Sequence, residues 1–259
     1  MGGSEDGQRP TPAMMPRRRP AIPPAQRVPA RSAFKVAVGM PRRGVPGAIM
    51  WPDTGVLLAL GTDQDLLDRF RRHYGGRVRL TRRVARELRA HSEACLGAYA
   101  PDQDYGRRQA AIRAVRSLLV GERSLPLAEP SEEDFAEIAR AAEQLKEVAD
   151  AGGKSHGGEA EIIVLAVHEA ARGGTEQILL SNDGGASLVA DRYGIRTRHV
   201  GDVLAEFACA DPDLAPETCL TAFQAAMRVS APPAHCRQET ADGFRCTTSP
   251  SGCAACDGA

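Results

Sequence analysis

The chain has 259 residues, and its 33 Lys and Arg residues balance its 33 Asp and Glu residues, so the formal net charge is zero. This length allows one large or two small domains with a sizeable core, and the neutral balance excludes a general electrostatic attraction to nucleic acid. No apolar run reaches the roughly 18–20 residues needed to cross a bilayer, so we expect no membrane contact. The odd number of 7 cysteines favours a reducing, cytoplasmic setting.

Residues 1–46 differ from the rest of the chain. They contain half of its 18 prolines, interleaved with Arg, Gln and Ser. Such a composition buries too little apolar surface to offset the entropy lost on ordering. We therefore predict a disordered Pro/Arg-rich tail.

From residue 47 onward, short apolar runs alternate with amphipathic helical patterns. Thr81 is expected to cap one helix, and Ser131 with Asp134 forms a capping-box pattern that opens another. The expected strands are 48–51, 78–80, 124–127, 177–181 and 195–199. The expected helices are 54–60, 63–73, 82–90, 105–120, 131–150, 159–172, 185–193, 202–210 and 216–229.

This alternation predicts an α/β protein with three α/β/α layers around a central parallel sheet of four to five strands. The predicted domain covers residues 47–210, and a C-terminal helix follows within 211–230. Residues 231–259 are rich in Pro, Gly, Ser and Cys, so we expect a flexible tail that contains cysteines.

Four acids stand at the ends of strands or in the helices that follow them. Asp53 and Asp183 come directly after expected strands, whereas Glu87 and Glu159 lie in or at the start of helices. Ligands of a parallel sheet bind outside the carboxyl ends of its strands, so all four side chains are expected at one rim. Converging carboxylates repel each other unless cations neutralise them, and oxygen ligands suit Mg²⁺ or Mn²⁺. We predict that these four acids are both the metal ligands and the catalytic residues.

Such a centre suits the hydrolysis of phosphodiesters. A bound divalent metal makes hydroxide available near neutral pH and stabilises charge on phosphate oxygens. No side-chain nucleophile is needed, and the sequence contains no convincing Ser–His or Cys–His arrangement.

Each acid also has a purely structural explanation. Asp53 and Asp183 are suited to cap the helices that follow them. Glu87 can pair with Arg83 four residues earlier, and Glu159 is favoured by the dipole of its helix. The metal centre is therefore predicted from the set of four and from no single member.

The local contexts of the four acids resemble the PIN domain, a family of metal-dependent nucleases, over about residues 47–210. The matching motifs are Asp53-Thr54-Gly55, Glu87 in TRRVAREL, Glu159 in GGEAEIIVLA, and Ser181-Asn182-Asp183. Gly55 departs from the family pattern, which usually has a small polar residue there. The resemblance implies a metal-dependent endoribonuclease that acts on RNA and forms a homodimer. For a toxin member of the family it also implies an antitoxin protein as partner.

Particular residues distinguish the nuclease from two other functions. A phosphatase of the haloacid-dehalogenase class would need an acid at position 55, which is Gly. A PIN-fold module that binds RNA or protein with little or no catalysis stays open. The histidines show no paired metal-ligand spacing and are expected to be ordinary surface or boundary residues. In the tail, Cys253-x-x-Cys256 could close a small zinc site with His235, Cys236 or Cys246, although incidental cysteines are favoured.

Overall fold

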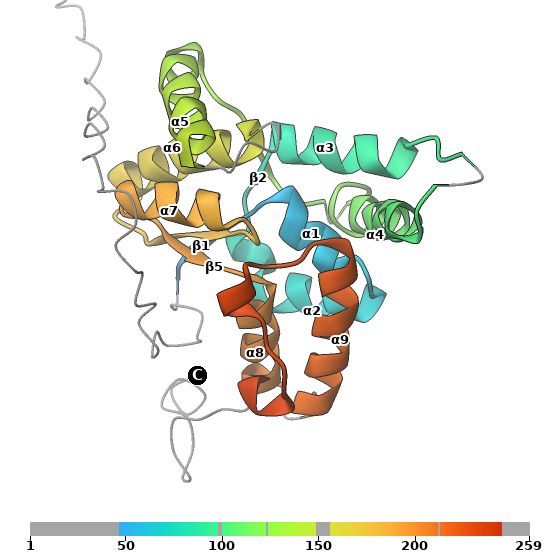
Figure 1. Ribbon diagram of the computed structural model, residues 1–259. Helices are drawn as coiled ribbons and strands as arrows, with labels where there is room; N and C mark the ends of the chain where they lie inside the picture. Colours follow the sequence, from blue (N-terminus) through green and yellow to red (C-terminus); the bar gives the residue numbers. More distant parts are fainter. Residues whose placement is uncertain (1–46, 98–99, 123, 149–155, 212, 245–259) are drawn as a thin grey trace, which may run out of the picture.

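A computed structural model of the chain describes residues 47–97, 100–122, 124–148, 156–211 and 213–244 (Figure 1). The predicted tail over residues 1–46 lies outside these ranges. So do Cys246, Cys253 and Cys256 of the predicted zinc alternative.

The protein is an α/β protein in which helices predominate around a small parallel sheet. Strands β1 (Ile49–Pro52), β4 (Gln177–Leu180) and β5 (Arg196–Arg198) form a three-stranded parallel sheet in the order β1-β4-β5. All residues of the central strand β4 are buried, as expected for an apolar strand that is covered on both faces. The α/β class predicted from the sequence is confirmed.

A second, two-stranded parallel sheet pairs β2 (Leu80–Thr81) with β3 (Leu127–Ala128). The strand predicted over 124–127 is therefore displaced towards the C-terminus. Pro126 has no N–H group to donate, although its carbonyl accepts a hydrogen bond from Leu80 N at 3.2 Å. Pairing in β3 consequently begins only after the proline.

The helices follow the predicted order, and α3 packs against α4, α5 against α6, and α8 against α9 (Figure 1). No helix within the described ranges is both long and apolar enough to span a membrane. The helices are α1 (Thr54–Leu60), α2 (Gln64–Tyr74), α3 (Arg82–Glu93), α4 (Asp102–Leu118), α5 (Phe135–Val148), α6 (Gly157–Gly173), α7 (Gly184–Arg192), α8 (Val200–Ala210) and α9 (Pro216–Val229).

The predicted helix caps are present. Thr81 Oγ1 accepts a hydrogen bond from Val84 N at 3.2 Å, which fixes the start of α3 directly after β2. Ser131 and Asp134 form the reciprocal capping box, in a short 3₁₀ turn that leads into α5. Local polar residues thus determine where these helices begin.

His168 is more deeply buried than the sequence suggested. Its Nδ1 lies 2.9 Å from an Asp134 oxygen and its Nε2 lies 2.9 Å from a Glu137 oxygen, and its side chain is only 4% exposed. The prediction of a surface or boundary residue is wrong here, because His168 ties α6 to the segment that opens α5.

The segment after α9 packs against the body of the protein as far as residue 244. Phe244 is 1% exposed, and its ring centroid lies 5.8 Å from that of Phe223 in α9. For residues 231–244 the structure therefore differs from the expected flexible tail, because an aromatic residue anchors their end in the core.

Candidate metal centre

Asp53 lies at the carboxyl end of β1 and caps α1. Its backbone N–H donates to Leu180 O at 2.8 Å, so the pairing with β4 continues up to this residue. One carboxylate oxygen accepts from Val56 N at 2.7 Å, and the other accepts from the Ser181 hydroxyl. Asp53 is only 4% exposed, so its carboxyl group is fixed in position and withdrawn from water.

Asp183 occupies the equivalent place after β4. Its Oδ1 accepts hydrogen bonds from Gly185 N at 2.7 Å and from Ala186 N at 3.0 Å, which caps α7. Its own N–H donates to Ser181 Oγ at 3.0 Å. Because the Ser181 hydroxyl also donates to Asp53, one side chain links the turns that carry these two acids.

Glu87 reaches the same region from α3. Its Oε2 accepts from the Thr54 hydroxyl at 2.6 Å, and its Oε1 lies 3.3 Å from Arg83 Nε. A Cβ atom at Gly158 would lie 3.3 Å from Glu87 Oε2, closer than a side chain normally tolerates. A glycine at this position therefore lets the first turn of α6 approach the carboxylate.

The start of α6 brings Glu159 into this region together with a histidine. His156, Glu159 and Asp183 each offer one ligand atom, and these atoms lie within 4.8 Å of one another. His156 is buried, which contradicts the expectation of a surface or boundary residue. The sequence signal that could have revealed it is its position, three residues before Glu159 at the start of a helix.

Electrostatic coupling joins all four acids. Burial and then the Glu159 carboxylate raise the pKa of Asp53 from 3.8 to about 7, with a further contribution from Asp183. Burial also raises the pKa of Glu159, and the carboxylates of Asp183 and Glu87 add to this effect, whereas His156 opposes it. Glu159 thus lies close enough to each of the other three acids to influence ionisation. Of the four predicted acids, the structure brings Glu159 and Asp183 within 4.8 Å of each other, whereas Asp53 and Glu87 lie outside that group and influence Glu159 or are influenced by it through their charges.

This donor set fits a divalent cation. Carboxylate oxygens are hard ligands of the kind that Mg²⁺ and Mn²⁺ take. The raised pKa values of Asp53 and Glu159 show that the cluster disfavours its own negative charge. A bound cation would relieve that penalty.

The structural explanations of the four acids hold as well. Asp53 and Asp183 cap helices, Glu87 pairs with Arg83, and Glu159 stands in the first turn of α6. Capping uses one oxygen of each aspartate, so these roles leave the acids with further lone pairs for a ligand.

The segment Ser230–Pro233, which we call the C-terminal strap, lies directly over two turns of the cluster. Asn182 Nδ2 donates to Ser230 O at 2.8 Å. A Cβ atom at Gly55 would lie 2.9 Å from Ser230 Oγ, and one at Gly184 would lie 3.3 Å from Pro233 Cγ. The seryl hydroxyl therefore occupies the space that a side chain at position 55 would need.

We expect Asn182→Ala to lower the free energy of unfolding by about 1–3 kcal/mol. Asn182 is buried, and besides its bond to the strap its Oδ1 accepts from Val200 N at 3.0 Å, so alanine leaves two polar partners unsatisfied. Urea unfolding followed by circular dichroism measures the change. Gln224→Ala, at an exposed position of α9, is the matched control and should change stability by less than about 0.5 kcal/mol. Equal effects of the two substitutions would contradict the assigned role of Asn182.

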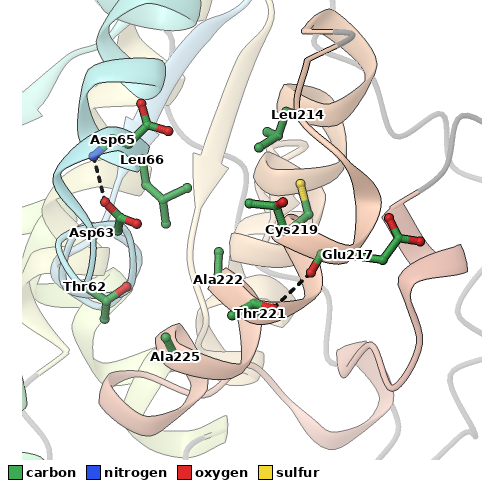
Figure 2. Close-up of a pocket in the computed structure, with 11 residues that line it drawn as sticks. Thr62, Asp63, Asp65, Leu66, Leu214, Glu217, Cys219, Thr221, Ala222 and Ala225 are labelled. Atoms are coloured by element: carbon green, nitrogen blue, oxygen red, sulfur yellow. Dashed lines mark hydrogen bonds between the residues drawn. The ribbon is translucent and has the colours of Figure 1, made fainter.

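A separate cavity of about 460 Å³ lies between the turn joining α1 to α2 and the N-terminal half of α9 (Figure 2). Asp63 and Leu66 stand on one side of it, and Leu214 and Cys219 stand on the other. Asp63 accepts from Asp65 N at 2.9 Å and thereby caps α2, so this acid has a structural role. None of the four clustered acids lines the cavity.

Comparisons with models of protein families, with curated proteins and with solved structures found no significant match to this chain. The function is therefore inferred from the chemistry of the clustered residues alone.

Proposed function

We propose that the protein is a metal-dependent endoribonuclease of the PIN type, with Asp53, Glu87, Glu159 and Asp183 as metal ligands. The observation that carries the proposal is the position of Glu159, which offers a ligand atom within 4.8 Å of one from Asp183 and whose charge raises the pKa of Asp53. Asp53 and Asp183 follow directly on β1 and β4, at the carboxyl ends where ligands of parallel sheets bind, which supports this assignment.

The arrangement of the strands supports the PIN-like fold. An isolated parallel bridge joins Met50 to Val78, and Arg79 N donates to Met50 O at 2.9 Å. If this contact is counted, the two sheets combine into five parallel strands in the order β3-β2-β1-β4-β5. Helices on both faces of such a sheet would give the three-layer α/β/α arrangement that we propose.

The residues around the acids are suited to hold them in place. Ser181 fixes the orientation of the Asp53 carboxylate, and Thr54 fixes that of Glu87. Arg83 places a guanidinium group beside Glu87 and against Gly157, at the edge of the cluster. We assign Arg83 a part in binding the RNA phosphate backbone, because guanidinium groups match phosphate geometry.

The proposed chemistry is in-line hydrolysis of a phosphodiester. When bound by these residues, Mg²⁺ or Mn²⁺ would supply a water of lowered pKa and neutralise charge on the phosphate. The protein contributes the carboxylates that hold the ion, and the buried position of Asp53 keeps its carboxyl group fixed.

Incubation of the purified protein with structured and single-stranded RNA tests this proposal. We expect cleavage with Mg²⁺ or Mn²⁺, no cleavage with EDTA, and recovery when excess metal is added back. Denaturing gel electrophoresis measures the products, and internal cuts distinguish an endonuclease from an exonuclease. Cleavage that persists in EDTA would contradict the proposal.

A PIN-fold module that binds RNA or protein with little or no catalysis is the alternative. It is favoured by the helix-capping roles of Asp53 and Asp183, which would retain both acids without any reaction. RNA binding without cleavage in either metal would support this alternative over the nuclease.

A further inference from the structure

Two histidines occupy the N-cap position of a helix, and their side chains differ in what they bind. His199 precedes α8, and its Nδ1 accepts a hydrogen bond from Gly201 N at 3.0 Å. His156 precedes α6, yet its side chain makes no capping hydrogen bond. Capping therefore explains the position of His199 but not that of His156.

The imidazole of His156 is buried without a protein partner among the residues that the structure describes. The residue as a whole is 6% exposed, no side-chain hydrogen bond or ion pair joins it to another described residue, and its interaction with Glu159 is electrostatic. Buried polar side chains nearly always have at least one partner, so an imidazole in this state is suited to receive a ligand.

Two acids lie near this imidazole. One ring nitrogen lies within 4.8 Å of carboxylate oxygens of Glu159 and Asp183, without a direct hydrogen bond to either. Two ligand atoms on opposite sides of a single cation, each at about 2.1–2.2 Å, are separated by about 4.3 Å. The limit of 4.8 Å exceeds this separation by about 0.5 Å, so the three ligand atoms would have to draw slightly closer together around a shared cation.

The sequence spacing favours the same arrangement. His156 and Glu159 are three residues apart, which places two side chains on one face of a helix. Histidine and glutamate at this separation can therefore reach one ion together.

We propose that His156 supplies a nitrogen ligand to the cation held by Glu159 and Asp183, and that this ligand makes the centre prefer a transition-metal ion such as Mn²⁺ over Mg²⁺. The inference rests on the metal centre of the proposed function but does not require RNA as substrate. Mg²⁺ takes oxygen ligands and keeps several waters, whereas transition-metal ions combine imidazole with carboxylate ligands.

Electron spin-echo spectroscopy of Mn²⁺ bound to the full-length protein tests this directly. We expect modulation from a directly bound ¹⁴N nucleus in the wild-type protein and its loss in His156→Gln. Mn²⁺ affinity, measured from the signal of free Mn²⁺, should fall at least about 10-fold in this variant. Even residues that only hydrogen-bond to a metal ligand change metal affinity by about 10–100-fold when they are replaced. Mg²⁺ affinity, measured by calorimetry, should change less than about threefold.

His199→Gln is the matched control, because it replaces the other N-cap histidine outside the cluster. It should keep both the ¹⁴N modulation and the Mn²⁺ affinity. Absence of ¹⁴N modulation in the wild-type protein would overturn the inference without any variant, and so would retention of that modulation in His156→Gln.

The outcomes for this inference and for the nuclease are separable. RNA cleavage without a ¹⁴N signal would overturn the role of His156 and leave the nuclease in place. A ¹⁴N signal that depends on His156, without RNA cleavage, would support the metal ligand and contradict the nuclease.

Discussion

Asp53→Asn and Asp183→Asn should each reduce metal-dependent RNA cleavage by at least about 1,000-fold. A metal centre contributes several kcal/mol to transition-state stabilisation, and each 1.36 kcal/mol corresponds to about tenfold in rate. Asparagine keeps the oxygen that accepts the capping hydrogen bonds from Val56 N or from Gly185 N, so the helices should still begin correctly. Single-turnover cleavage rates in Mn²⁺, together with circular dichroism spectra, measure activity and folding separately.

Asp63→Asn is the matched control for Asp53→Asn. Asp63 also caps a helix, but it is exposed and stands outside the cluster. We expect this variant to cleave RNA at the wild-type rate. Cleavage that survives both Asp53→Asn and Asp183→Asn would contradict the metal centre and point to another site or to a contaminant.

Removing the same carboxyl group should stabilise the metal-free protein at alkaline pH. Burial and Glu159 raise the pKa of Asp53 from 3.8 to about 7 in the folded protein. Because the folded protein favours the protonated Asp53 side chain, protonation contributes its full stabilisation below pH 4. This stabilisation is lost as the pH rises through 7. Above pH 7 the wild-type protein bears the full free-energy cost of an ionised, buried Asp53, on the order of 4 kcal/mol at most. Asparagine has no charge and bears none of this cost.

We therefore expect metal-free Asp53→Asn to be more stable than the wild-type protein at pH 8, and the difference to shrink towards pH 5. Urea unfolding in EDTA at pH 5, 6.5 and 8 measures both proteins. Added Mn²⁺ should stabilise the wild-type protein at pH 8 and should have a much weaker effect on the variant. A variant that is less stable than the wild-type protein at pH 8 would contradict the electrostatic cost assigned to Asp53.

The sequence predicts best those features that depend on neighbouring residues. The apolar run of β4, the Thr81 cap and the Ser131 capping box all use local interactions, and each is present. The boundaries of β3 were less predictable. A strand of two residues is defined by its partner, and here Pro126 moves the pairing towards the C-terminus.

The candidate site was only partly predictable for a related reason. The four acids could be nominated because each follows a strand or lies in the helix after one, which local patterns reveal. His156 could be nominated only from its spacing to Glu159, and Ser230 could not be nominated at all, because its position near the acids arises from packing between distant segments. For the same reason the sequence suggested only that a polar group is missing at Gly55, without the hydroxyl from residue 230 that lies beside it.

The C-terminal strap also constrains the number of residues in α9, the helix that directly precedes it. Ser230 is the residue immediately after α9, and each helical residue advances the chain by 1.5 Å and turns it by about 100°. Deleting or inserting one residue within α9 would rotate the seryl hydroxyl away from Gly55 and Asn182, even if the helix kept its amphipathic character. Variation in the number of residues in α9 should therefore be tolerated less well than variation in their identity on its exposed face.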